Sequence, residues 1–285
     1  GAHWKALFVG SEGMLGAIVK LWLRLKPLPE LTRTFLATYT NLEQASAAIV
    51  ALVRHPLIPV AAELMDPNCV RLVELSPFRA GLDPDSWALL AEINGPAVLV
   101  EAYSPDIEAL LKLHAAGSVR STTDTREREK LWKARKVGGG LPGQVSPDVM
   151  VQDVVIPRTR LTEVLTEIYR ESEAEGIPVI NLFHAGDGNL HPNFMFDARV
   201  PGQAEAVRRL GKRLMEKALS VGGTLSGEHG IGSDKMEYLP LLFGPAELAA
   251  QAAVAATFNP NHQLNPGKLL PARRFQSKAT PREGA

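Results

Sequence analysis

Strand and helix patterns follow one another in an order that occurs twice along the chain, and this order restricts the fold more than any other feature. In the first half, the β-rich run "TRTFLATYT" leads into an Asn-capped amphipathic helix from about Asn41 to His55. A helix from Ser104 to about Ala116 comes later, and three strand-like segments surround it: "IPVAAELM" and "AVLVEAYS" before, "SVRSTTD" after. This order predicts a sheet with helices on one face.

The same order recurs in the second half of the chain. The predicted elements are strand "MVQDVVIP", a helix from Arg158 to about Glu175, strands "PVINLFH" and "LHPNFMF", and a helix from about Gly202 to Val221. We therefore predict an α+β fold in which duplicated ferredoxin-like units form an antiparallel sheet with helices on one face. A C-terminal helical segment, from Ala246 to Phe258, completes the prediction. The duplication rests on element order alone.

Composition narrows the partners and the kind of site. Of the 285 residues, 45% are hydrophobic and 22% charged, which is typical of a globular protein with a sizeable core. Basic and acidic residues balance at 31 each, so neither nucleic acid nor an anionic membrane is favoured as a partner. Cys69 is the only cysteine, which excludes an intrachain disulfide and a Cys-rich metal cluster. No stretch approaches the ~18 apolar residues of a transmembrane segment, so we expect a cytoplasmic protein.

The N-terminal segment has the pattern of a strand. Apolar side chains occupy every second position of "AIVKLWLRLKP", which predicts a half-buried strand closed by Pro27. The glycines of the preceding "GSEGMLG" therefore lead into a strand rather than a helix, which excludes a Walker loop and a dinucleotide fingerprint. Because residue 1 opens directly on this segment without a methionine, we expect the chain to be a fragment.

Two short segments rich in histidine, acid and glycine carry the chemistry of the sequence. In "NLFHAGDGNLHPN", His184 ends one predicted strand and His191 begins the next, so the two should face each other across a hairpin. Glu228, in the later "GEHG", is a natural third ligand. Imidazole and carboxylate together suit zinc, manganese or iron, and three protein ligands leave positions open for a substrate. The neighbouring His229 is placed to act as a base.

Each of these residues also has an ordinary structural interpretation. A histidine near a strand end is usually hydrogen bonded or solvated, and His229 could bond a backbone carbonyl in its turn. The glycines around the histidines could simply serve tight turns. Arg135 follows Trp132 by three residues on a charged helix from Thr125 to Lys136, so both can share an inward face where a guanidinium could bind a carboxylate. The alternative for Arg135 is surface charge. The next segment, "VGGGLPGQ", is predicted to be a loop.

With "GSEGMLG", "LWKAR", "FHAGDGNLHP", "SGEHGIG" and "LNPGK" in this order, the chain resembles the flavin-linked 2-hydroxy-acid dehydrogenases of the vanillyl-alcohol-oxidase superfamily. Within it, the resemblance is to the family that contains glycolate oxidase and D-lactate dehydrogenase, and it covers only the C-terminal part. The resemblance implies that His184, His191 and Glu228 bind a divalent metal and that His229 is the general base. Arg135 would meet the substrate carboxylate, with Asn193 as a further substrate contact.

The resemblance also implies FAD as cofactor. Its contacts would be Asn265 and the residues of the first motif: Gly10, Ser11, Glu12, Gly13, Leu15 and Gly16. Residues 1–28 would be the last strand and loop of a truncated FAD-binding domain, and 29–244 the substrate, or cap, domain. Residues 245–272 would form a C-terminal helix and a segment returning to the FAD side, and 273–285 a disordered tail.

The function implied is oxidation of a short 2-hydroxy acid, glycolate or D-lactate, by hydride transfer to FAD, with the fragment inactive alone. Relatives with hydroxy-dicarboxylate substrates carry polar residues after the arginine, whereas this chain has "VGGG", so a second acid group is not expected. Flavin- and iron–sulfur-containing subunits are the expected partners, and they could attach the protein to the inner membrane. Two alternatives stay open: a metal-dependent hydrolase, since a His/His/Glu site can activate water, and a non-catalytic metal-binding assembly module.

Overall fold

The computed structural model describes residues 3–114 and 116–270, which form two compact units. The sheet unit runs from Leu23 to His229, and the terminal unit combines the residues up to Trp22 with those from Gly230 onward. The segment after Gly230 contacts the N-terminal residues, since Ile231 N donates a hydrogen bond to Glu12. The predicted domain limits at 28 and 244 stay predictions. The predicted disordered tail, 273–285, lies outside the described residues.

The first half of the sheet unit has the predicted order of elements, with one helix inserted. Its elements are β1 (Leu31–Tyr39), α2 (Leu42–Leu52), β2 (Ala61–Met65), α3 (Pro67–Leu75), β3 (Trp87–Gly95), α4 (Ala97–Leu113) and β4 (Ser118–Thr122). As predicted, Asn41 caps α2, and its side chain accepts a hydrogen bond from Gln44 N at 2.9 Å. The inserted helix is α3.

A connection of two helices, α5 (Thr125–Gly138) and α6 (Pro142–Val145), leads to the second half. There the elements are β5 (Asp148–Val151), β6 (Val154–Val155), η1 (Arg158–Arg160), α7 (Leu161–Ala174), β7 (Val179–Phe183), β8 (Asn189–Leu190), β9 (Pro192–Phe196) and α8 (Gln203–Ser220). The main sheet has seven strands in the order β4-β1-β3-β2-β7-β9-β5, all pairs being antiparallel. The halves join where Leu64 and Met65 pair with Phe183 and Leu182. The predicted duplicated α+β fold is confirmed.

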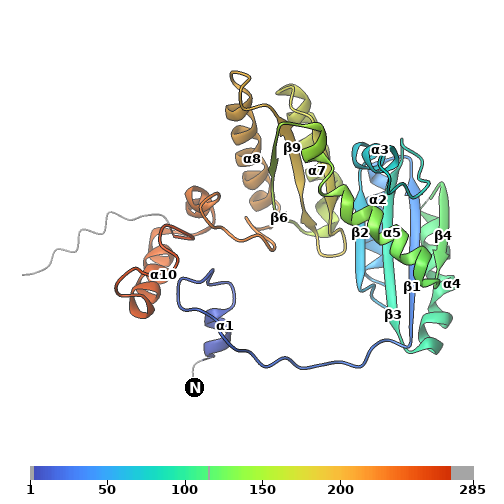
Figure 1. Cartoon of the computed structure of the whole chain (residues 1–285), viewed down its shortest axis with the longest axis horizontal. Helices are drawn as coiled ribbons and strands as arrows, with labels where there is room; N and C mark the ends of the chain where they lie inside the picture. Colours follow the sequence, from blue (N-terminus) through green and yellow to red (C-terminus); the bar gives the residue numbers. More distant parts are fainter. Residues whose placement is uncertain (1–2, 115, 271–285) are drawn as a thin grey trace, which may run out of the picture. The chain divides into compact units, whose positions relative to one another are not determined.

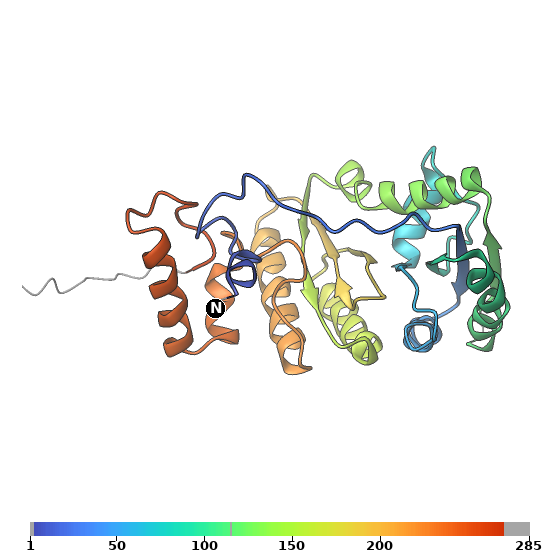
Figure 2. The same cartoon turned by 90° about the horizontal axis from the view of Figure 1, so that it is seen from below.

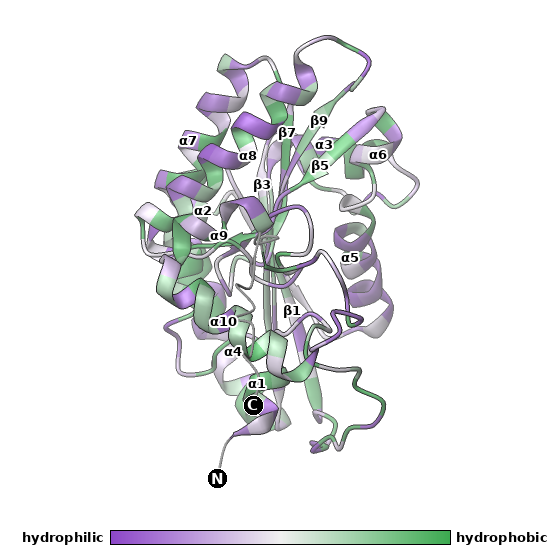
Figure 3. Ribbon diagram, turned by 90° about the vertical axis from the view of Figure 1, so that its left-hand side faces the viewer, coloured by the Kyte–Doolittle hydropathy of each residue, from purple (hydrophilic) through white to green (hydrophobic). Residues whose placement is uncertain are grey.

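Helices cover both faces of this sheet (Figure 1, Figure 3). The helices of the repeated units, α2, α4, α7 and α8, share one face, as predicted. The inserted helices α3 and α5 pack on the other face, where Val70, Leu131 and Ala134 join Met65 and Leu90 in one buried cluster. Both faces need cover because adjacent strand residues are apolar on each side: Leu64 and Met65 are 0% and 2% exposed.

One predicted strand is a helix. The segment "AVLVEAYS" forms the first half of α4. The strand of this region is instead the preceding β3, "WALLAEING", which the sequence pattern did not reveal. A short apolar run fits either structure, and the tertiary packing decides: Val100, Ile107 and Leu111 are all fully buried at helical spacing. The helix was predicted to begin at Ser104, but α4 begins at Ala97 and continues through Pro105.

Three other local predictions need correction. Residues 18–27 form no strand, because no described strand pairs with their backbone. The side chains of Val19 and Trp22 are 94% and 92% exposed, so the predicted half-buried face is not formed. The predicted loop after α5 is partly helical, since α5 includes Gly138 and α6 begins at Pro142. The strand predicted at 150–157 is two strands, β5 and β6, that pair with different partners.

The terminal unit is helical (Figure 2). It contains α1 (Trp4–Phe8), η2 (Met236–Tyr238), α9 (Leu239–Leu242) and α10 (Pro245–Phe258). The rings of Trp4 and Phe8 pack edge-on against Phe258, with centroids 6.1 and 5.6 Å away. These contacts join α1 to α10 within the terminal unit.

Candidate metal centre

The two histidines of the hairpin lie on one face but not directly opposite each other. His184 pairs with Asn189, and β7 pairs with β9 so that Asn181 is opposite Pro192. His191 is therefore two residues from the partner of His184, a diagonal neighbour on the same face. The imidazole rings still meet, with centroids 5.2 Å apart and planes at 88°. The two histidines were predicted to face each other directly, but they form a diagonal pair. The imidazole side chains are long enough to meet in spite of the two-residue offset.

The structure brings the three predicted ligands together. Glu228 Oε1 lies 3.4 Å from His184 Nε2 and 3.1 Å from His191 Nε2. One potential ligand atom from each of the three residues lies within 4.8 Å of the other two. His191 is nearly buried, whereas the Glu228 side chain is 51% exposed, so the cluster has one open side. This arrangement suits three protein ligands and an exogenous one.

The hydrogen bonds at the far side of each ring determine which nitrogens face the cluster. His184 Nδ1 is 2.7 Å from Glu63 Oε1, and His191 Nδ1 is 3.4 Å from the carbonyl oxygen of Gln152. A carboxylate and a carbonyl can only accept, so each Nδ1 is assigned the proton and each Nε2 presents a lone pair. Burial lowers the pKa of His191, with smaller opposing and reinforcing contributions from Asp153 and the other two histidines, which favours the neutral form.

Two imidazole lone pairs and a carboxylate oxygen therefore converge on one point. His191 Nε2 is buried and has no hydrogen-bond partner among the described residues, although Glu228 Oε1 is close to it. Three electron-rich atoms at these distances repel one another, and a positive charge between them, a metal ion or a proton on an imidazole nitrogen, removes that repulsion. The donor set thus fits a divalent metal ion, which prefers imidazole nitrogen with carboxylate oxygen.

A buried acid that the sequence reasoning did not single out holds the loop of Glu228. The carboxylate of Asp153, 0% exposed, accepts hydrogen bonds from Ser226 Oγ at 2.6 Å and from the backbone N–H groups of Gly227, Glu228 and His229 at 3.0–3.2 Å. One carboxylate therefore aligns the loop that carries both Glu228 and His229. Its only signal in the sequence is an acid inside the apolar run "MVQDVVIP".

His229, the candidate base, lies beside the three ligands. Its ring stacks on His191 with centroids 4.9 Å apart and planes at 13°, and its Nε2 is 3.7 Å from Glu228 Oε1. The side chain is 47% exposed. An imidazole with this position and access can exchange a proton with a molecule bound at the open side.

Arg135 lies next to the cluster, but its guanidinium already binds the carboxylate of Glu63. Its Nε and Nη2 donate to Glu63 Oε2 at 3.0 and 2.7 Å, and the two side chains are 15% and 8% exposed. No described residue accepts a hydrogen bond from Nη1, the nitrogen that a substrate carboxylate could still use. The sequence reasoning missed Glu63, whose only signal is a lone acid in the apolar "IPVAAELM".

Asn193 is buried between backbone groups. Its Nδ2 donates to the carbonyl oxygens of Ile180 and His191 at 3.3 and 2.7 Å. A substrate contact through this nitrogen would replace bonds that tie β9 to β7 and to the hairpin. The substrate role of Asn193 stays a prediction.

The residues predicted to contact FAD lie in the terminal unit, where they hold separate segments together. The Glu12 carboxylate accepts from Ile231 N at 2.7 Å and Gly232 N at 2.8 Å, and Asn265 Nδ2 donates to the carbonyl oxygen of Glu12. Gly10 and Gly13 have φ values of +81° and +77°, so the loop turns in a way that favours glycine. Because the side chains of Glu12 and Asn265 already form hydrogen bonds within the terminal unit, the groups of this loop that could bind a ligand are those of its backbone.

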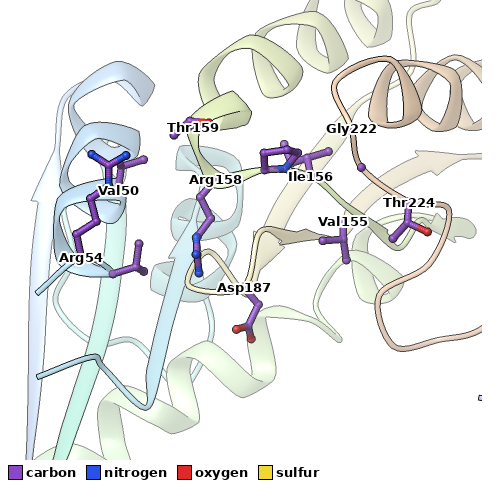
Figure 4. A pocket seen from close by; sticks show the side chains of 12 residues that line it. Val50, Arg54, Val155, Ile156, Arg158, Thr159, Asp187, Gly222 and Thr224 are labelled. Atoms are coloured by element: carbon purple, nitrogen blue, oxygen red, sulfur yellow. The ribbon is translucent and has the colours of Figure 1, made fainter. Parts of the chain in front are cut away.

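A hollow of about 590 Å³ lies elsewhere on the sheet unit (Figure 4). Arg54, in the turn after α2, stands across it from Arg158, and Asp187 of the hairpin turn lies at its edge. Arg158 Nη1 donates to the carbonyl oxygen of Gly186 at 2.7 Å. His184, His191 and Glu228 do not line this hollow, so among the described residues it is a different place from the candidate metal centre.

The chain combines an α+β sheet domain with a candidate metal centre, and comparison with known proteins gives its family. Residues 28–269 match the family "FAD linked oxidases, C-terminal domain", and the chain belongs to it.

Two relatives and one solved structure illustrate the match. Glycolate oxidase subunit GlcD of Escherichia coli (strain K12) is 38% identical over 267 residues, which are 93% of this chain and 53% of that protein. Mitochondrial D-lactate dehydrogenase (cytochrome) of Arabidopsis thaliana is 28% identical over 267 residues, or 93% of this chain and 47% of that protein. An alkyldihydroxyacetonephosphate synthase structure, 16% identical, superimposes with a TM-score of 0.65 over 93% of this chain and 49% of its own, a likeness of fold alone. The chain spans about half the length of the relatives it matches.

Within the described residues, the structure contains no helix with both the length and the apolar character that a membrane crossing requires.

Proposed function

We propose that this chain is the substrate- and metal-binding part of a flavin-dependent dehydrogenase that oxidises a short 2-hydroxy acid, glycolate or D-lactate, to the 2-oxo acid. The family and the names of the relatives support this reaction class. The observation that supports the proposal is the convergence of His184 Nε2, His191 Nε2 and Glu228 Oε1, a donor set that suits a divalent cation.

His184, His191 and Glu228 would hold a zinc, manganese or iron ion. Such an ion supplies a Lewis acid that makes a bound hydroxyl group more acidic. The residues contribute two neutral imidazole nitrogens and one negative charge. They leave the solvent side open for the hydroxyl and carboxylate oxygens of a 2-hydroxy acid.

His229 would take the hydroxyl proton at Nε2. The ring lies beside the ligands, its orientation is limited by stacking on His191, and its half-exposed position lets the proton pass on to solvent. Arg135 would bind the substrate carboxylate through Nη1, while its other nitrogens stay with Glu63. With one guanidinium nitrogen available, the site suits a substrate with a single acid group.

FAD supplies the hydride acceptor in this family of reactions. In this chain, the loop from Gly10 to Gly16 would contact the flavin through its backbone, and Asn265 would hold that loop in shape. We further propose that the chain alone is inactive and that flavin- and iron–sulfur-containing partner subunits complete the enzyme, since Cys69 is its only cysteine. A cytoplasmic location, peripheral to the inner membrane through those partners, fits this assembly.

The test combines the chain with the part of the Escherichia coli relative that this chain does not match, where an FAD-binding domain is expected. We expect flavin absorbance to bleach anaerobically with glycolate or D-lactate, and neither half to do so alone. His229→Ala should lose ~10²–10⁴-fold in the rate of bleaching while substrate still binds. Ester or amide hydrolysis by the chain without flavin would instead support a metal-dependent hydrolase. Metal binding without either reaction would support an assembly module.

A further inference from the structure

We propose that Glu63 is a positioning residue that holds His184 in the tautomer and orientation a metal requires. The proposal rests on the proposed function, because it concerns the same metal centre. It adds a residue to the centre that lies 121 positions away from His184 in the sequence. Glu63 itself is not a ligand; it would act through the ring of His184.

The contact between Glu63 and His184 is short and buried. Glu63 Oε1 lies 2.7 Å from His184 Nδ1, and the Glu63 side chain is 8% exposed. A carboxylate that accepts this bond requires the proton on Nδ1 and leaves the Nε2 lone pair for the ion, beside the Glu228 carboxylate. Carboxylate partners of this type orient ligating histidines in many metal sites and make them stronger donors.

Arg135 decides the geometry of the carboxylate rather than the tautomer of the ring. Its Nη2 lies 3.5 Å from His184 Nδ1, but only 2.7 Å from Glu63 Oε2. The shorter, charge-assisted bond is the stronger one, so Nδ1 is not an acceptor for Arg135. Because Arg135 grips Oε2 through two nitrogens, Oε1 is left facing the imidazole.

The same sheet face contains a matched pair without a histidine. Glu92 on β3 accepts from Arg128 Nη2 at 2.8 Å and Arg128 Nε at 3.3 Å, and the two side chains are 13% and 23% exposed. Ala61 pairs with Glu92, so Glu63 is the diagonal neighbour of Glu92 on the same face. Arg128 and Arg135 lie on α5 seven residues apart, two helical turns along one side. Glu92→Gln is therefore the control for Glu63→Gln.

The first experiment needs no metal. In the metal-free chain, ¹⁵N NMR of the histidine rings, with His184 assigned through His184→Gln, reports which nitrogen carries the proton. We expect Nδ1–H and an unprotonated Nε2 at His184 in the wild type and in Glu92→Gln, and a mixture of tautomers in Glu63→Gln. A wild-type His184 protonated on Nε2, or a tautomer unchanged by Glu63→Gln, would overturn the proposal.

The second experiment measures Mn²⁺ and Zn²⁺ binding by calorimetry. Glu63→Gln should weaken binding by ~10–100-fold, the usual effect of losing an outer partner, whereas Glu92→Gln should stay within about twofold of wild type. Equal losses in both variants would show that Glu63 matters only for stability. If the wild type itself binds neither ion, the proposed function fails and the tautomer measurement alone decides the role of Glu63.

Discussion

Two largely buried arginine–glutamate pairs lie side by side between α5 and the sheet, and they differ in the other groups that each carboxylate meets. Glu92 accepts hydrogen bonds from Thr34 Oγ1 at 2.6 Å and from Trp132 Nε1 at 2.8 Å, so its neighbours are structural. Glu63 meets His184, a candidate metal ligand, at 2.7 Å. Both pairs hold α5 on the sheet, but only the pair of Glu63 also contacts a residue of the candidate metal centre. The difference lies in one contact, which variants of each pair can probe.

The largest expected effect is on stability. Arg135→Met leaves the nearly buried Glu63 without its cation and should lower the free energy of unfolding by about 3–5 kcal/mol. Arg128→Met should cost less, because Glu92 keeps the Thr34 and Trp132 bonds and is more exposed. Urea unfolding of both variants tests the ranking. An equal or greater loss for Arg128→Met would show that the two carboxylates depend on their arginines alike.

Asp66 extends the comparison to a buried acid that has no cation among its hydrogen-bond donors. It is 0% exposed and accepts from Cys69 N, Asn181 N and Tyr169 Oη, each at 2.7 Å. Burial raises the pKa of Asp66 from 3.8 to about 6, more than these hydrogen bonds lower it. The folded state therefore holds the proton more tightly than the unfolded state. Its contribution to stability is complete below pH 3.8 and is lost as the pH rises through about 6.

The expected size follows from that pKa. The rise corresponds to roughly 3 kcal/mol, so the free energy of unfolding of the wild type should fall by up to that amount, relative to Asp66→Asn, between about pH 4 and pH 7. Chemical unfolding at several pH values measures the difference. A wild type that gains on Asp66→Asn as the pH rises would have the opposite sign and would reject the assignment.

Trp132→Phe removes one bond to Glu92 and leaves Glu63 untouched. Because the indole N–H bonds a charged acceptor at 2.8 Å, its loss should cost about 2 kcal/mol. Mn²⁺ affinity should stay at the wild-type value. Scanning calorimetry of the variant checks the stability, and titration calorimetry checks the Mn²⁺ affinity. A weakened Mn²⁺ affinity would show that the two pairs beneath α5 are coupled.

The smallest effect is expected for an ion pair at the surface. Arg71 Nη2 lies 2.7 Å from Asp85 Oδ1, as close as Arg135 lies to Glu63, but the side chains are 49% and 79% exposed. Arg71→Met should change the free energy of unfolding by about 0.5 kcal/mol or less, because water screens the pair. A loss comparable to that of Arg135→Met would mean that burial does not explain the difference between these pairs.

The site was predictable where its residues are close in sequence. His184 and His191 share one hairpin, so strand alternation and a short turn suffice to bring them together, although the diagonal register needed the structure. Glu228 was proposed as the third ligand from its acid- and histidine-bearing motif "GEHG", whereas the FAD loop came from the resemblance to the family. Glu63 and Asp153 could not be found in this way. Each is a lone acid in an apolar stretch of sequence, and the partners that explain it lie 121 and 75 residues away.

The fold was predictable from the order of elements more than from their identity. The pattern of β1 and α2 was clear because alternation and an Asn cap are local signals. The strand predicted at 97–104 belongs to α4, and β3 was missed, since a fully buried strand and a buried helix both appear as short apolar runs. Packing of Val100, Ile107 and Leu111 decides between them, and packing is not a local property.

The central claim is that His184, His191 and Glu228 hold one divalent cation. Crystals of the chain grown with Mn²⁺, and diffraction data collected near the manganese absorption edge, test it directly. We predict an anomalous difference peak within coordination distance of both Nε2 atoms and the Glu228 carboxylate, and its disappearance in His191→Ala. A manganese peak on other residues, or none at these three in crystals that contain the ion, would contradict the claim.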